Sequence, residues 1–268
     1  MVDTLSPGQL SDWPKTQDVR NMTYQDDIRD QASKILNEEW KIRDGQVVPS
    51  TDDVAHKNGA VKLEATFLYA DLAGSSELQK EYLDTFAAKA VRMYLGGATS
   101  IIRKFGGSIK SFDGDRVMGV FVGKSMRNDA VKAAFAIEWF VSQVINPMVK
   151  KRHEKNGTSN VWVARHGIGI DAGEALIVRA GVRNRPGQHN HNDLIFVGRA
   201  PNVAAKLSSF RDESAGPIII THDVYSFLKP EQKKFLKSDK NVWSNPKTET
   251  VGPHSLKLYR SSYWRSPS

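Results

Sequence analysis

A strand that ends on a carboxylate and then breaks into small residues constrains this chain more than any other stretch. From Phe67 to Leu72 nearly every residue is apolar, which is the pattern of a central strand. Asp71 lies at its end, where burying an ionised carboxylate is costly unless the group is paired or binds a cation. Gly74, Ser75 and Ser76 then begin a helix, and the amides of a helix N-terminus favour phosphate. Metal beside phosphate is the first hypothesis, and a turn with a serine cap is the simpler alternative.

The 268-residue chain contains no cysteine, which excludes a disulfide framework and a thiolate metal site. Any metal must therefore have oxygen or histidine ligands, which favours Mg²⁺ or Mn²⁺. No apolar run approaches the roughly 20 residues that cross a bilayer, and the first residues lack the plan of a signal peptide, so we expect a cytoplasmic protein without a membrane partner. The net charge of +8 indicates an anionic partner. That partner could be nucleic acid, a membrane surface or a polyphosphate substrate, and charge alone does not choose among them. The basic residues form no stripe interleaved with aromatic residues, so we interpret their local clusters as solvated helix ends.

Apolar periodicity predicts an α+β protein. Helices are predicted at 24–43, 78–105, 128–149, 201–210 and 222–228. Strands are predicted at 63–72, 108–112, 116–122, 161–170, 174–180, 194–197, 217–221 and, as an edge strand, within 255–264. We expect the first long helix to be continuous or divided at Gly96-Gly97, and 153–160 and 181–192 to be loops. This order predicts a ferredoxin-like βααββαβ core, with a mixed sheet covered by helices.

A second carboxylate follows in the hairpin around Asp113-Gly114. Turn chemistry accounts for Asp113, but it explains Asp115 less well, because apolar strand residues follow it directly. Asp71 and Asp115 together would suit two oxygen-ligated ions that promote displacement at phosphorus. Phosphoryl chemistry is therefore the leading class.

Four ordered motifs resemble the catalytic domain of class III nucleotide cyclases. They are FLYADLAGS at 67–75, GGSIKSFDGD at 106–115, GIGIDAGE at 167–174 and VGRAPNVAAKL at 197–207. The resemblance implies that Asp71, Asp115 and the main-chain carbonyl of Leu72 bind two ions, Mn²⁺ or Mg²⁺. It divides the chain into an N-terminal arm and helix, 1–60, and a catalytic domain, 61–268.

The same resemblance implies a homodimer with shared active sites, the metals coming from one subunit and two nucleotide-binding residues from the other. Asn202 matches the residue that orients the ribose, and Lys206 stands where the family has a transition-state arginine. Lysine keeps the charge but lacks the planar fork of arginine. Arg199 or Arg211 is an alternative source of the guanidinium.

Base selection is the main departure from purine cyclases. The two positions that read the purine edge in that family are Ser111 and Ile195 here, although Lys110 and Asp193 would restore polarity after a slip in the alignment. The pattern is similar to the pyrimidine cyclases of bacterial anti-phage signalling, the Pycsar group. This implies synthesis of cyclic UMP, or cyclic CMP, from the triphosphate, with release of pyrophosphate and a separate effector that reads the product.

Three alternatives remain open from the sequence: an adenylate or guanylate cyclase, a catalytically inactive nucleotide sensor, and a nucleic-acid-binding protein. His189 and His191 lie in a polar stretch without an evident third ligand, so we interpret them as solvated rather than as metal ligands.

Overall fold

The computed structural model describes residues 23–157, 161–182, 191–210, 216–236 and 238–267. The chain divides into two units, residues 1–40 and 41–268. The first contains α1 (Tyr24–Asn37), which begins with a capping box. The Thr23 hydroxyl accepts from the Asp26 amide at 3.3 Å, and the Asp26 carboxylate accepts from the Thr23 amide at 3.1 Å. The predicted helix to Arg43 is too long, because Lys41–Gly45 is a strand.

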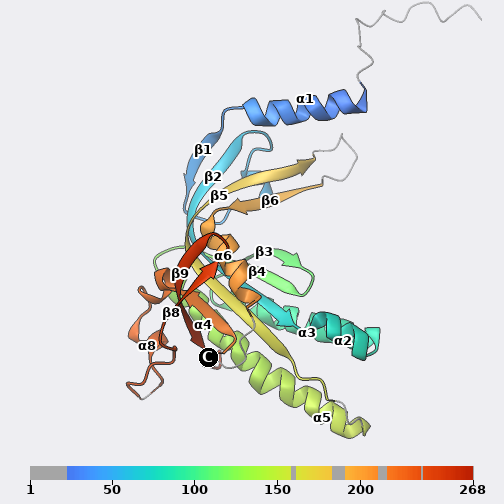
Figure 1. The fold of residues 1–268 in the computed structure, drawn as a ribbon, viewed down its shortest axis with the longest axis vertical. Coiled ribbons are helices and arrows are strands. Elements are labelled where there is room, and N and C mark those ends of the chain that lie inside the picture. The colour runs from blue at the N-terminus through green and yellow to red at the C-terminus, as the bar shows by residue number, and fades with distance from the viewer. Residues whose placement is uncertain (1–22, 158–160, 183–190, 211–215, 237, 268) are drawn as a thin grey trace, which may run out of the picture. The chain divides into compact units, whose positions relative to one another are not determined.

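The described residues of the second unit form one mixed sheet (Figure 1). Its strands are β1 (Lys41–Gly45), β2 (Gly59–Ala73), β3 (Ser108–Asp113), β4 (Arg116–Phe121), β5 (Arg165–Val182), β6 (His191–Val197), β7 (Ile218–Thr221), β8 (Lys247–Val251) and β9 (His254–Ser261). The order is β3-β4-β2-β5-β7-β9-β8. β1 runs parallel to the first half of β2, and β6 pairs with the second half of β5. The two long strands β2 and β5 therefore form the centre of the unit.

Helices connect and cover these strands. They are α2 (Ser75–Glu81), α3 (Asp84–Lys104), α4 (Met126–Trp139), a π-helical segment (Phe140–Ile145), α5 (Asn146–Asn156), α6 (Arg199–Ser208), α7 (His222–Tyr225) and α8 (Pro230–Lys233), with a 3₁₀ turn at Thr51–Asp53. Among the helices that the structure describes, none is long and apolar enough to cross a membrane.

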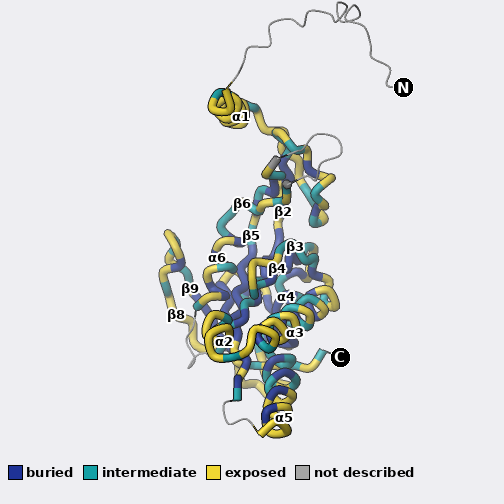
Figure 2. The backbone as a smooth tube through the Cα atoms, turned by 90° about the vertical axis from the view of Figure 1, so that its right-hand side faces the viewer, coloured by how far each residue is buried: buried dark blue, intermediate teal, exposed yellow. Residues whose placement is uncertain are grey.

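The two faces of β2 are covered by different helices, as its alternating pattern requires. Leu68 and Leu72 pack in the cluster that contains α3 and α4. Phe67 belongs to the other cluster, with Ala200 and Ala204 of α6. Figure 2 shows α6 and α4 on opposite sides of the strands, with buried backbone between them. Because Asp71 has the same parity as Phe67, it lies on the α6 face.

The predicted α+β class and mixed sheet are confirmed, but several elements differ from prediction. The predicted strand pair around Asp171-Ala172-Gly173 is wrong, because β5 passes straight through these residues and pairs with β2 along its length. The predicted edge strand β9 is flanked on both sides, and β8, which the sequence did not predict, lies at the edge.

The helix boundaries also differ. The first long helix divides at Tyr82 and Leu83, whose backbones are extended, rather than at Gly96-Gly97. Gly97 permits close packing instead, since a Cβ there would lie 2.0 Å from the Phe140 ring. The helix predicted at 128–149 continues through α5, so the loop predicted from His153 is helical as far as Asn156. Most of the loop predicted at 181–192 lies outside the described residues.

Candidate active site

The two carboxylates predicted to bind metal lie on adjacent segments of the sheet. Asp71 pairs with Arg116 of β4 and with Gly167 of β5. Asp115 lies in the turn between β3 and β4, and its carbonyl accepts a hydrogen bond from the Leu72 amide at 3.3 Å. Both aspartates are half-buried. The β3–β4 hairpin thus brings Asp115 beside the end of β2.

The donor set at this position suits a hard cation. Asp71 and Asp115 offer carboxylate oxygens and Leu72 a main-chain oxygen, which are ligands that Mg²⁺ and Mn²⁺ prefer. Among the described residues, no group of three or more His, Asp or Glu could hold a metal. The aspartate pair therefore fits an ion that also takes oxygens from a bound substrate.

The predicted phosphate-binding residues follow directly. Gly74 forms the N-cap of α2 and has a left-handed backbone conformation, with φ 72°. A residue with a side chain adopts this conformation only at a cost in free energy. Ser75 and Asp115 line one cavity of about 890 Å³. The remaining lining residues are Gln79, Asp84, Ala87, Ala88, Val91, Arg92, Leu95, Gly96, Thr99, Phe112 and Gly114. The cavity therefore connects the start of α2 with the carboxylate turn.

A cation that sequence reasoning missed flanks the aspartate pair. The Arg116 guanidinium carbon lies 5.6 Å from the centre of the Tyr69 ring, and the side chain forms an ion pair with Asp113. Burial raises the pKa of the Tyr69 hydroxyl. The sequence could have indicated this cation, because Arg116 directly follows Asp115.

The predicted nucleotide-binding residues lie on α6, away from this cavity. Asn202 and Lys206 are exposed on one side of the helix, while Val203, Ala204 and Leu207 are buried on the other. None of the lining residues of the cavity belongs to α6. Within the described part of one chain, the aspartates beside the cavity and the predicted nucleotide-binding residues of α6 are therefore separate.

The proposed base-reading residues are also apart. Through the sheet, Ser111 is in register with Tyr69 of β2, and Ile195 is in register with Ala60. These positions are nine residues apart along β2, about 30 Å of strand. Sheet pairing alone does not bring Ser111 and Ile195 together.

Lys110 is the extra residue of a β-bulge, since the β3–β4 register shifts between Ile109 and Ser111. Its ammonium donates to the Pro49 carbonyl at 2.6 Å. Asp193 is exposed, and its carboxylate accepts from the neighbouring Leu194 amide at 2.7 Å. Both residues considered as alternative base readers thus have hydrogen-bond partners within this chain.

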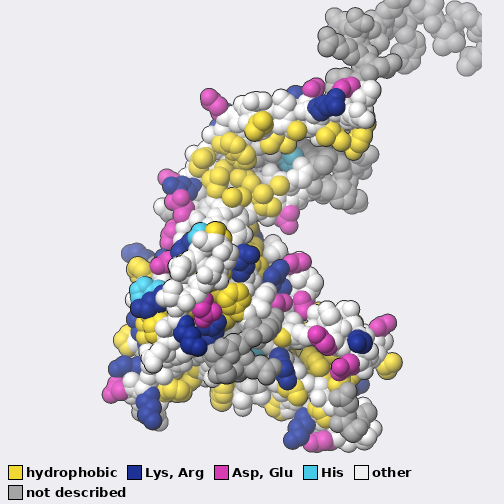
Figure 3. Space-filling view, in the orientation of Figure 1, with side chains coloured by type: hydrophobic (Ala, Val, Ile, Leu, Met, Phe, Trp, Pro, Cys, Tyr) yellow, Lys and Arg dark blue, Asp and Glu magenta, His cyan; other side chains and the backbone are white. Residues whose placement is uncertain are grey.

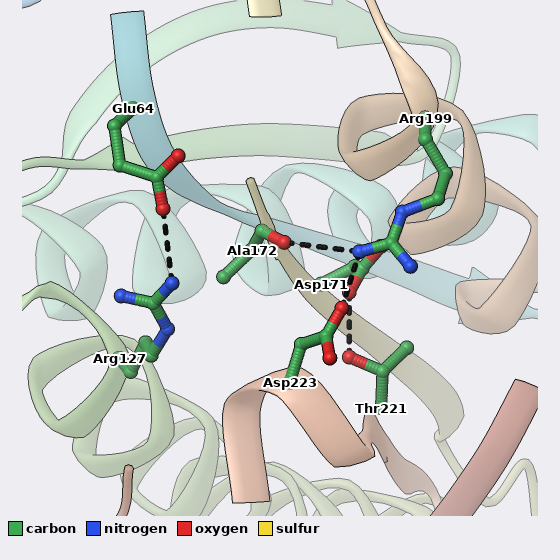
Figure 4. A network of polar contacts seen from close by, with 7 residues as sticks. All are labelled: Glu64, Arg127, Asp171, Ala172, Arg199, Thr221 and Asp223. Carbon is green, nitrogen blue, oxygen red and sulfur yellow. Dashed lines mark hydrogen bonds and ion pairs between the residues drawn. The ribbon is translucent and has the colours of Figure 1, made fainter. Parts of the chain in front are cut away.

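A second polar cluster, also missed from the sequence, surrounds Asp171 (Figure 4). This side chain is fully buried on β5 and accepts from the Thr221 hydroxyl at 2.5 Å. Arg199, the first residue of α6, lies 3.5 Å from it and donates to Asp223 at 2.5 Å. Burial raises the pKa of Asp171 to about 6, against the opposing effects of Thr221 and Arg199. Arg199 therefore contacts two carboxylates of its own chain, buried Asp171 and exposed Asp223, and Arg211 lies outside the described residues.

No model of a known protein family matches the chain. Solved structures share its fold. A bacterial light-regulated adenylyl cyclase aligns with a TM-score of 0.60 and 20% identity, covering 75% of this chain and 51% of that one. The adenylyl cyclase CyaB from P. aeruginosa aligns with a TM-score of 0.55 and 22% identity, covering 75% and 95%. The fold is that of a class III nucleotide cyclase catalytic domain.

Curated relatives place the chain more closely. A uridylate cyclase from Rhodovulum sp. (strain MB263) is 38% identical over 92% of this chain and 99% of its own length. A uridylate cyclase from Xanthomonas perforans is 34% identical over 91% and 99%. The chain therefore belongs to the uridylate cyclase family, and it is a nucleotide cyclase.

Proposed function

We propose that this protein converts UTP, with CTP as the second choice, into the 3′,5′-cyclic monophosphate and pyrophosphate. The observation that carries the proposal is the β3–β4 hairpin, which places Asp115 of the cavity next to the end of β2 that carries Asp71, in a chain that is 38% identical to a uridylate cyclase. The structural relatives that are adenylyl cyclases have 20–22% identity and support the fold rather than the base.

In the proposed reaction, the ribose 3′-oxygen attacks the α-phosphorus, the bond to the β-phosphate bridging oxygen breaks, and pyrophosphate leaves. Class III cyclases generally use two divalent ions, which when bound would lower the pKa of the attacking hydroxyl and neutralise phosphate charge. Asp71, Asp115 and the Leu72 carbonyl would hold these ions, proposed to be Mn²⁺ or Mg²⁺. The amides at Gly74, Ser75 and Ser76 would bind phosphate oxygens.

The other half of the proposed active site consists of residues on α6. The Asn202 amide would hold the ribose, so that the 3′-hydroxyl lies in line with the bond that breaks. The Lys206 ammonium would stabilise the charge that builds on the α-phosphoryl oxygens. Ser111 and Ile195 stay the proposed base-contacting residues, because they replace the hydrogen-bonding groups that a purine site needs.

We propose a homodimer whose two active sites are each completed by both subunits. Class III cyclases are commonly dimeric, and the cavity beside Asp115 has no lining residue from α6 of the same chain. A second copy would supply the missing helix, and two-fold symmetry would then create two equivalent sites.

The proposed setting is the cytoplasm, in bacterial anti-phage defence, with the cyclic nucleotide read by a separate effector protein. The support is the family membership and the nature of the product. A partner nucleic acid is not proposed. On the face of the second unit seen in Figure 3, basic and acidic side chains are interspersed rather than gathered by sign.

The function is tested by incubating the protein with each of the four ribonucleoside triphosphates and Mn²⁺, followed by chromatography. We expect cyclic UMP and an equal amount of pyrophosphate from UTP. Cyclic AMP or cyclic GMP as the main product would contradict the base assignment.

A catalytically inactive nucleotide sensor is the second candidate, because Lys206 stands where the family has a transition-state arginine and lacks its planar fork. Stabilisation of the protein by UTP, without any cyclic product, would favour this candidate.

A further inference from the structure

The helix that carries Asn202 and Lys206, α6, packs closely against β5. On β5, the residues facing α6 are Gly169, Asp171, Gly173 and Ala175, so small residues surround one carboxylate. A Cβ at Gly169 would lie 2.1 Å from the Ala204 carbonyl oxygen. The backbone of α6 therefore lies directly against β5.

Asp171 is enclosed at this contact. One carboxylate oxygen accepts from Thr221 at 2.5 Å. The other is 3.5 Å from Arg199 Nη2 and has no hydrogen-bond partner. A buried carboxylate held this way costs free energy unless a cation stays beside it. Its nearby cation is the first residue of α6.

Arg199 links the start of α6 to other elements. Its Nη2 donates to Asp223 of α7 at 2.5 Å and to the Ala172 carbonyl of β5 at 3.3 Å. Arg199, Asn202 and Lys206 are spaced i, i+3 and i+7, which places them along one side of the helix. Fixing the Arg199 end of this stripe therefore fixes the rotation of the two residues that follow it.

We propose that Asp171 and Arg199 are a positioning pair that sets the rotation and placement of α6, so that Asn202 and Lys206 meet the nucleotide held by the partner subunit's metal site. This rests on the proposed function. The pair acts through α6 and is not itself catalytic. Figure 4 shows the pair between β5, α6 and α7.

The variants that test the pair are Asp171→Asn, which keeps an acceptor for Thr221, and Arg199→Ala. We expect each to lower kcat about ten- to a hundredfold, because small misplacements of binding groups reduce turnover strongly. The Mn²⁺ concentration for half-activation should be unchanged, because Asp71 and Asp115 are untouched. Glu64→Gln is the matched control: it removes the charge of the Glu64–Arg127 ion pair, 2.9 Å, which does not involve α6.

Mixed dimers give the decisive readout, because Asp171 lies on the strand next to Asp71 yet is proposed to act in the other half of the site. Each positioning variant is co-expressed with Asp71→Ala or with Asn202→Ala. With Asp71→Ala, half of the dimers are mixed and each has one intact site, so about a quarter of wild-type activity should return. With Asn202→Ala, no such gain should appear.

Three results would overturn the inference. Wild-type kcat in both variants would show that α6 needs no such pair. Loss of activity in Arg199→Ala with full activity in Asp171→Asn would make Arg199 a nucleotide contact. Failure of Asp171→Asn to recover with either partner, although dimers form, would indicate a general structural role. If the wild-type protein itself forms no cyclic product, the proposed function fails instead.

Discussion

Asp71 and Asp171 are the same residue type on the same face of neighbouring strands, yet their surroundings differ. They are four register positions apart, since Asp71 is opposite Gly167 and Asp171 is opposite Phe67. Asp71 lies half-buried at the end of β2, beside Asp115 at the edge of a cavity. Asp171 is fully buried, with Arg199 and Thr221 beside it.

The two carboxylates differ in burial and in the groups around them. Thr221 donates to the Asp171 carboxylate, and Arg199 lies 3.5 Å from it, so its surroundings are supplied by the fold. Asp71 is half-buried next to Asp115, and we propose that these two carboxylates bind divalent ions together with the substrate. A sequence pattern that places aspartate in a strand therefore does not decide its role, because the role depends on groups that other elements bring to it.

The largest effect on activity should come from replacing Asp71. Asp71→Ala should abolish cyclic nucleotide formation while the dimer stays intact, because the divalent ions lose a ligand. Product chromatography and sedimentation measure the two properties. Asp113→Ala is the control, since Asp113 is the exposed last residue of β3 in the same hairpin. Retained turnover in Asp71→Ala would contradict the metal assignment.

The next largest effect concerns α6. Lys206→Ala should lower kcat by roughly 10²–10³, because a preorganised charge opposite the transition state is lost. Lys206→Arg should retain activity, since arginine keeps the charge and adds a planar fork. Steady-state kinetics with UTP separates kcat from KM. Equal activity of the alanine variant and the wild type would remove Lys206 from the mechanism.

Asp171 should affect how the free energy of unfolding depends on pH. Burial raises the pKa of Asp171 from 3.8 to about 6, so its protonated form stabilises the fold at low pH, and this contribution is lost as pH rises through 6. Arg199 of α6 and Asp223 of α7 are the charged groups that face it. Relative to Asp171→Asn, the wild-type free energy of unfolding should fall by about 2 kcal/mol between pH 4 and pH 7.

Urea titrations across this pH range provide the measurement. Parallel curves for the two proteins would show that Asp171 titrates in the same way in the folded and unfolded states. That result would contradict its enclosure beneath α6.

A smaller effect should come from the packing of α6 against β5. Gly169→Ala should destabilise the fold by about 1–3 kcal/mol, because its methyl group would meet the Ala204 carbonyl. Gly96→Ala is a matched control, since nothing lies within 4 Å of a Cβ there, and it should stabilise α3 by about 0.5–1 kcal/mol. Thermal unfolding compares them. An unchanged midpoint of thermal unfolding for Gly169→Ala would mean that α6 does not pack closely against β5.

Local patterns were sufficient where they coincide with the tertiary fold. The apolar run before Asp71, the turn at Asp113-Gly114 and the periodicity of 201–210 each led to an observed element. The ordered motifs indicated the class III fold, which the relatives confirm. These predictions worked because each signal, whether an apolar run, a turn or a motif, is contained in one short stretch of the sequence.

Long-range packing decided the rest. Asp171-Ala172-Gly173 has turn-like composition, but its backbone pairs with Ala65, Thr66 and Phe67 of β2. The apolar spacing predicted a helix as far as Arg43, yet Lys41–Gly45 is a strand that pairs with β2 residues eighteen positions later. The role of Arg199 depends on Asp223 and Asp171 from other elements. None of these partners is encoded in the neighbouring residues.

The central claim is that one chain carries two half-sites, the aspartate pair and α6, which meet across a dimer. Co-expression of Asp71→Ala with Asn202→Ala tests it most directly, because each homodimer lacks one half. The account predicts that about a quarter of wild-type cyclic UMP formation returns in the mixture, since half of the dimers are mixed and each contains one intact site. No recovery in a mixture whose mixed dimers are demonstrated by affinity tags would contradict it.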